Sequence, residues 1–136
     1  MHEQVPWRHA PDAATIERLA RAALARIPEP FKGYLGDIVL VVEDFADDAT
    51  LDALGIDDPF DLSGIYHGRP VGDKSVWDSA PEPDRIHLYR RAILDEWVAT
   101  GVPLAELVTH IVVHEVGHHF GLSDDDMHRL EDSDDT

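Results

Sequence analysis

The chain of 136 residues contains no cysteine. Disulfide frameworks and thiolate metal sites are therefore excluded, and any metal ion must be held by His, Asp, Glu or the backbone. Basic residues are also scarce, because 11 Lys and Arg stand against 28 Asp and Glu, which gives a formal net charge of −17. Nucleic acids are bound largely through Lys and Arg on phosphates. The charge balance therefore predicts no nucleic-acid partner and favours a soluble acidic protein.

Long apolar runs are missing as well. A membrane-spanning helix needs about 18 or more apolar residues in succession. The longest candidate, Val102–Val113, is interrupted by Pro103, Glu106 and His110. The first residues, MHEQVPWRHAPD, lack the apolar stretch of a secretory signal. Together with the absence of cysteine, these features predict a cytoplasmic protein without a membrane partner.

Apolar periodicity predicts one α+β domain over residues 1–136, with flexible tails at 1–11 and 129–136. Helices are expected at 12–27, around 50–54, over an apolar stripe at 93–98 capped by Gly101, and from Pro103 to about Phe120. Strands are expected at 38–42, 64–68 and 85–90. Residues 28–36 have the composition of a turn-rich connection, and 69–84 that of a long loop.

The last predicted helix carries the pattern HExxHxxGxxD, made by His114, Glu115, His118, Gly121 and Asp124. On a helix His118 lies about 40° round from His114, so two imidazoles one turn apart can hold one ion. Glu115, about 100° round, is placed to reach a water on that ion. A left-handed Gly121 would end the helix and let Asp124 swing back to the metal, although the two aspartates after it compete for that role. Three protein ligands leave a fourth position open, so we predict one catalytic Zn²⁺.

The register of this helix supports the same site. The apolar stripe at positions 104, 107, 108 and 111 continues through His114, Glu115 and His118. Polar groups aimed inward are costly to bury without partners, and a metal ion with its water would satisfy all three. His110 lies two turns, about 12 Å, from His118 and cannot share the ion with both, so a structural role is expected for it. His119 is expected to point away from His114, either into solvent or beside the ligands.

The predicted function is a zinc-dependent metallopeptidase-like hydrolase. Zinc lowers the pKa of its water toward about 7, so Glu115 can take the proton at neutral pH. The hydroxide then attacks a peptide or amide carbonyl, and Glu115 passes the proton to the leaving amine. The second donor to the oxyanion stays open among Tyr66, His67, Arg69 and Tyr89, which are expected to border the cleft.

These residues resemble a known group. His114-Glu115-x-x-His118 matches the zincin metallopeptidases, and the extension to Asp124 looks like the metzincin ligand set with Asp in place of the third His. The chain is similar to the small bacterial zincin-like metallopeptidases with a minimal zincin fold, through GIYxG at 64–68, IxLYR at 86–90 and HEVGHHFGLSD at 114–124. The resemblance spans roughly residues 35–127.

The resemblance implies a small mixed sheet packed against the N-terminal helix and the C-terminal HExxH helix, with a strand edge beside the metal. By this analogy the strand from Ile86 to Tyr89 is that edge and pairs with an extended peptide. Tyr66, Ile86, Leu88 and Tyr89 are then the expected substrate contacts, and the partner is a peptide or an unfolded polypeptide.

Two departures from larger zincins support an alternative function. Only twelve residues follow Asp124, and Met127 is no clear counterpart of the methionine turn beneath the metal in metzincins. The alternative is a weakly active or inactive zinc-binding interaction module that holds an extended partner segment. Glu115 favours the enzyme, because a purely structural site needs no carboxylate beside an open coordination position.

Overall fold

Five α-helices, one 3₁₀ helix and three strands make up the part of the chain that the computed structural model describes, residues 9–29, 31–35, 38–68, 84–123, 125, 126 and 129. The helices are α1 (Ala13–Ala25), α2 (Phe31–Leu35), α3 (Asp48–Leu54), η1 (Pro59–Asp61), α4 (Arg90–Thr100) and α5 (Leu104–Phe120). The strands are β1 (Val39–Glu43), β2 (Gly64–His67) and β3 (Arg85–Tyr89). The predicted α+β class is confirmed.

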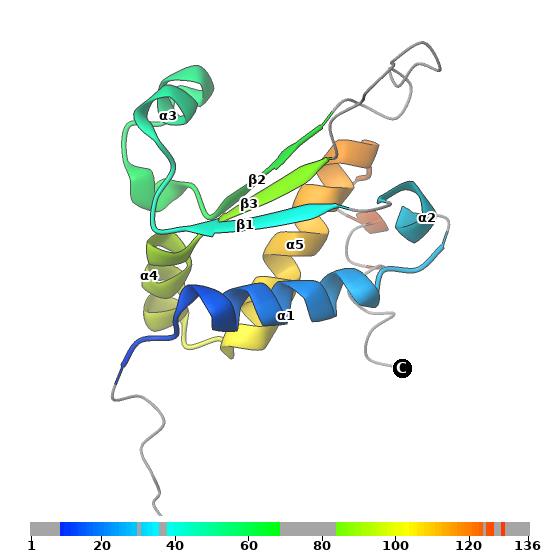
Figure 1. Ribbon diagram of the computed structural model, residues 1–136, viewed down its shortest axis with the longest axis horizontal. Helices are drawn as coiled ribbons and strands as arrows, with labels where there is room; N and C mark the ends of the chain where they lie inside the picture. Colours follow the sequence, from blue (N-terminus) through cyan, green and yellow to red (C-terminus); the bar gives the residue numbers. More distant parts are fainter. Residues whose placement is uncertain are drawn as a thin grey trace, which may run out of the picture.

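The three strands form one mixed sheet in the order β1-β3-β2 (Figure 1). β1 runs parallel to β3, with Leu40 opposite Ile86, and β2 runs antiparallel to β3, with Tyr66 opposite Ile86. The parallel pair is possible because a long crossover separates β1 from β3 in the chain. β3 is therefore the central strand, and β1 and β2 are the two edges.

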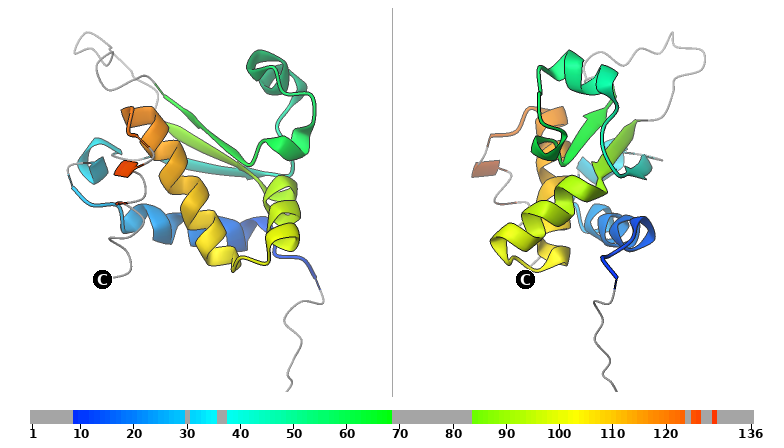
Figure 2. Two further views of the ribbon diagram at one scale, coloured as in Figure 1. Left: turned by 180° about the vertical axis from the view of Figure 1, so that it is seen from behind. Right: turned by 90° about the vertical axis from the view of Figure 1, so that its left-hand side faces the viewer.

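One face of the sheet carries the main core, which α1 and α5 cover (Figures 1 and 2). Side chains alternate along a strand, so Ile86 and Leu88 share one face, and both are fully buried. They pack into a cluster with the apolar stripes of the two helices. Its helical members with 0% exposure are Ile16 and Ala20 of α1, Ile93 of α4, and Val108, Val112 and Val116 of α5. Both long helices thus present one apolar side to the sheet, as the sequence periodicity predicts.

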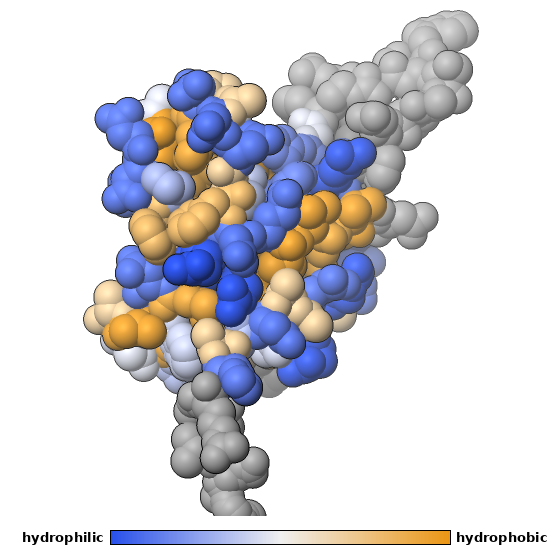
Figure 3. All heavy atoms as spheres, turned by 60° about the vertical axis from the view of Figure 1, so that its left-hand side comes forward, coloured by the Kyte–Doolittle hydropathy of each residue, from blue (hydrophilic) through white to orange (hydrophobic). Residues whose placement is uncertain are grey.

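Within the described ranges, α3 packs against one end of the other face. A smaller cluster joins Leu51 of α3 to Tyr89 and Ala92. Val39, on the same face, keeps 37% of its surface exposed among the described residues. Figure 3 shows hydrophobic and hydrophilic groups side by side over the face of the molecule turned toward the viewer. The two faces of the sheet are therefore unequal, and α5 lies on the fully packed one.

The segment 28–36, predicted as a turn-rich connection, contains the short helix α2 instead. Its first turn closes when Lys32 N–H donates to the Pro28 carbonyl at 3.2 Å. Phe31 then packs against Phe120 at the end of α5, with ring centroids 5.4 Å apart. This contact is made across the fold, so local composition did not reveal the helix.

Most of the predicted tails and nearly all of the predicted 69–84 loop lie outside the described residues. Pro11, placed in the N-terminal tail, is buried, and its carbonyl accepts a 2.8 Å hydrogen bond from Arg90 Nε. Within the described ranges, no helix has both the length and the apolar character that a membrane crossing requires.

Candidate functional site

Helix α5 ends where the sequence predicts. Gly121 follows Phe120 with φ 71° in the left-handed region, which glycine adopts at little cost. Its N–H donates to the His118 carbonyl at 3.1 Å, and Leu122 N–H donates to the Gly117 carbonyl at 2.9 Å. This closure turns the chain sharply just after the HExxH segment. Asp124, the predicted third ligand, comes three residues later and lies outside the described residues.

His114 and His118 stand on successive turns of α5, with ring centroids 6.0 Å apart and ring planes at 87°. His118 is exposed and His114 is half-buried, so both imidazoles lie near the surface of the protein. Their spacing fits two ligands of one ion, as the motif predicts. No third His, Asp or Glu among the described residues joins them in a group that could hold a metal. The proposed ligand set therefore still depends on Asp124.

His110 packs against His114 from the preceding turn, with ring centroids 4.0 Å apart and planes at 47°. Ring contact of this kind can fix the orientation of an imidazole without ligation. The structural role predicted for His110 is consistent with this position.

The Glu115 side chain is partly buried beside His114 and His118. Burial raises the pKa of its carboxyl, against the opposing effects of the charge of His118 and of a hydrogen bond from the backbone of Tyr66. A carboxyl with a raised pKa binds a proton more readily than an ordinary glutamate. That is the property a general base needs near neutral pH.

A close approach between α5 and β2 brings Tyr66 to Glu115. A Cβ on Gly64 would lie only 3.2 Å from the Ile111 side chain and 3.1 Å from the His87 carbonyl, so a larger residue would push the strand away. Four residues along a helix cover about 6 Å, and two residues along a strand cover about 6.6 Å. Two residues further along β2 and four residues further along α5, the contact of Gly64 with Ile111 is therefore followed by the contact of Tyr66 with Glu115.

The edge strand beside α5 is β2, and the assignment of that edge to Ile86–Tyr89 is wrong. β3 is paired on both sides, with β1 and with β2. Tyr89 N–H donates to the Ser63 carbonyl at 2.9 Å, which identifies their pair as hydrogen-bonded. Alternation along the ladder then directs the main-chain groups of Gly64 and Tyr66 to the outer edge of β2, which pairs with no other described strand.

The predicted substrate contacts on β3 are core residues. Ile86 and Leu88 are 0% exposed and Tyr89 is 2% exposed, so none of them presents a surface to a peptide. The analogy failed here because a strand's own residues show that it is apolar but do not show which strands flank it. Of the four predicted contacts, only Tyr66 lies on the edge strand.

Leu88→Ala should therefore act on stability. We expect the free energy of unfolding to fall by about 2–5 kcal/mol, the usual cost of a cavity in a packed core. Thermal or urea denaturation measures it, with Val98→Ala on the exposed side of α4, at 78% exposure, as the control. A normal stability combined with a raised KM would show instead that Leu88 contacts substrate.

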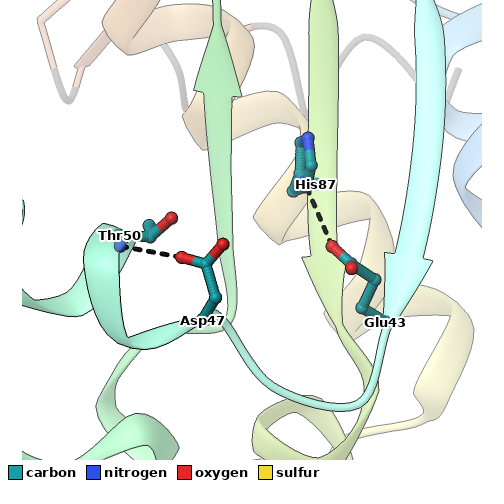
Figure 4. A network of polar contacts seen from close by, with 4 residues as sticks. All are labelled: Glu43, Asp47, Thr50 and His87. Atoms are coloured by element: carbon teal, nitrogen blue, oxygen red, sulfur yellow. Dashed lines mark hydrogen bonds and ion pairs between the residues drawn. The ribbon is translucent and has the colours of Figure 1, made fainter.

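Two of the three described candidates for the oxyanion donor, Tyr89 and His67, lie away from α5. Tyr89 is covered from the opposite face, where burial, followed by the charges of Glu43 and Asp47, raises its pKa to about 12. His67 lies on that face too, with its ring 4.8 Å from the ring of His87. Figure 4 shows this neighbourhood, where His87 Nδ1 contacts Glu43 Oε1 at 3.1 Å and Asp47 accepts from Thr50 N–H.

Tyr66 is the one described candidate that faces α5, but its hydroxyl is engaged. It donates to Asp84 Oδ2 at 2.7 Å. Arg69, the remaining candidate, lies outside the described residues. Tyr66 and Arg69 therefore stay the predicted candidates for a second oxyanion donor.

Asp84 and His119 belong to the site region although the sequence did not single them out. Asp84 is 7% exposed and is the one buried charged residue within the described ranges. The His119 side chain is 6% exposed, and its Nε2 lies 3.7 Å from Asp84 Oδ2. His119 therefore lies inside the protein, beside Asp84 and Tyr66, and not in solvent. The GIYxG pattern and the His-His doublet were the available signals, but neither pointed to Asp84.

Comparison with known proteins places these elements in a family. The sequence pattern of the zincin-like metallopeptidases matches residues 35–133, which include all three strands and the whole of α5. No curated protein matches the chain in sequence. The match confirms the resemblance inferred from the HExxH motif and its surroundings.

Proposed function

Because the chain belongs to the zincin-like metallopeptidase family, we propose that it hydrolyses peptide bonds with a bound zinc ion and with Glu115 as general base. One observation carries the proposal. The Glu115 carboxyl is affected by the charge of His118 and accepts a hydrogen bond from the backbone of Tyr66 on β2, and burial raises its pKa. The proposed ligand pair, the proposed base and a strand edge are thus neighbours.

His114, His118 and Asp124 are the residues we propose to hold the ion. Two imidazoles on successive turns suit zinc, and a carboxylate completes a common catalytic set. The bound ion would supply a positive charge that acidifies a coordinated water and polarises the carbonyl under attack.

Glu115 is proposed to move the proton. Its carboxylate oxygens accept the proton of the attacking water and return it to the leaving amine nitrogen. The hydrogen bond from the Tyr66 backbone restricts the side chain on one side, which leaves the other oxygen for the water. The partial burial of Glu115 keeps bulk water from competing for this proton.

The substrate is proposed to be an extended segment of a peptide or an unfolded polypeptide lying along β2. The outer edge of β2 presents the main-chain groups of Gly64 and the carbonyl of Tyr66. An extended chain can add to such an edge through main-chain hydrogen bonds. The scissile bond of a segment bound there would lie close to Glu115, because Tyr66 belongs to the edge strand and its backbone contacts the Glu115 carboxylate.

Metal removal from the full-length protein tests the proposal. We expect elemental analysis to find about one zinc ion per chain and a peptide library to be cleaved at neutral pH. Cleavage should be lost after chelation and dialysis and should return when zinc is added back, with Mg²⁺ addition as the control. Zinc binding without any cleavage would contradict the hydrolase and support the interaction module.

A further inference from the structure

Tyr66 connects Glu115 to a buried polar cluster. Its backbone hydrogen-bonds to the Glu115 carboxylate, and its hydroxyl donates to Asp84 Oδ2 at 2.7 Å. Its ring stacks on His119, with centroids 4.0 Å apart and planes at 15°. Burial, followed by the bond to Asp84, raises the pKa of Tyr66, so the hydroxyl stays protonated and remains a donor. One residue thus contacts both the proposed base and the cluster.

Asp84 is fixed by its main chain as well as by its side chain. Its carbonyl accepts a hydrogen bond from Val39 N–H at 2.9 Å, which holds it at the start of the sheet. A buried carboxylate is costly unless polar partners surround it. Here the Tyr66 hydroxyl and His119 Nε2 both lie near Asp84 Oδ2, at 2.7 and 3.7 Å. The carboxylate therefore links β2 to the last turn of α5.

Gly68 shows how closely the chain packs around this carboxylate. A Cβ at this position would lie 2.5 Å from Asp84 Oδ1 and 2.9 Å from Cε1 of Tyr66. Any side chain there would displace Asp84, Tyr66 or both. Glycine is thus required for the cluster to form as it does.

We infer that Asp84 and His119 are positioning residues that hold Tyr66 so that its backbone N–H stays directed at Glu115. The hydroxyl bond fixes the rotation of the Tyr66 ring, and the stack fixes its plane. With both contacts in place the strand cannot move away from α5, and the Glu115 side chain keeps one orientation. The catalytic meaning of this arrangement rests on the proposed function, but the arrangement itself can be tested without it.

Amide hydrogen exchange of the ¹⁵N-labelled full-length protein tests the inference directly. Asp84→Ala should raise the exchange rate of the Tyr66 amide by about tenfold or more, the effect of losing one well-placed hydrogen bond. The Leu88 amide, on the central strand, should change far less. Asp84→Asn keeps an acceptor for the tyrosine hydroxyl and should restore most of the protection. Asp95→Ala, an exposed aspartate on α4, is the control.

Tyr66→Phe is the second variant, because it removes only the hydroxyl and keeps the stack on His119. The amide of residue 66 should again exchange faster, and in an active preparation kcat should fall about tenfold with KM nearly unchanged. An unchanged amide, or an equal rise at Leu88, would overturn the inference. If the wild-type protein cleaves nothing, the exchange data still decide it, so the two proposals fail separately.

Discussion

Replacement of Glu115 by glutamine is expected to lower peptide hydrolysis by about 10²–10⁴-fold, the usual contribution of a general base, while zinc binding is retained. Glutamine has the same length and can still accept the hydrogen bond from the Tyr66 backbone, so local packing should persist. It cannot take a proton from water, however. Steady-state rates on a cleaved library peptide, together with elemental analysis of both proteins, measure the effect.

Glu106→Gln is the matched control, because Glu106 lies in the first turn of the same helix and is exposed. It should leave rate and zinc content unchanged. Equal rates for wild type and Glu115→Gln would remove Glu115 from the mechanism. A loss of zinc in Glu115→Gln would show that the carboxylate is itself a ligand.

The elements of the fold were largely predictable because each depends on local patterns. The 3.6-residue repeat of α1 and α5, the left-handed glycines after α4 and α5, and the β-branched run of β1 are all signals within a few residues. The same holds for the histidine pair, since helix geometry alone brings His114 and His118 together. Local signals therefore gave the elements and the pair of proposed ligands.

Strand order and the buried cluster were not predictable in this way. Ile86 and Leu88 have the same apolar pattern whether their strand is central or at an edge, so pairing on both sides could not be read from them. Asp84 ends a polar segment whose composition is that of a loop. Its burial depends on Tyr66 and His119, which come from two other elements. Such contacts exist only once the sheet has packed on α5.

The inward register of α5 was only partly predictable. The stripe at 104, 107, 108 and 111 was extended to His118, but His118 is exposed, whereas the His119 side chain is buried. The buried face of α5 also includes Val112 and Val116, which lie outside that stripe. The stripe that meets β2 is Ile111, Glu115 and His119, each one turn apart. Tertiary packing, more than periodicity, decided which histidine faces inward.

His118→Ala is expected to weaken zinc binding by more than 100-fold, because removal of a direct ligand should exceed the roughly 10–100-fold cost of losing an outer partner. His114→Ala should behave alike, since the two imidazoles stand on successive turns of one helix. Competition with a chromophoric chelator at fixed pH measures the dissociation constants. His110→Ala should change them little, although its ring touches that of His114.

Three adjacent aspartates compete for the role of third ligand, and alanine substitutions distinguish them. Asp124→Ala should weaken zinc binding by a factor similar to that of His118→Ala, whereas Asp125→Ala and Asp126→Ala should leave it nearly unchanged. The reason is position: Gly121 reverses the chain, and Asp124 is the first carboxylate after the turn. Asp126 already receives a hydrogen bond from Arg129 at 3.5 Å, and its N–H donates to the Ser123 hydroxyl at 3.2 Å. A larger loss with Asp125→Ala or Asp126→Ala than with Asp124→Ala would reassign the ligand, and a loss with none of the three would leave the histidine pair without the proposed carboxylate.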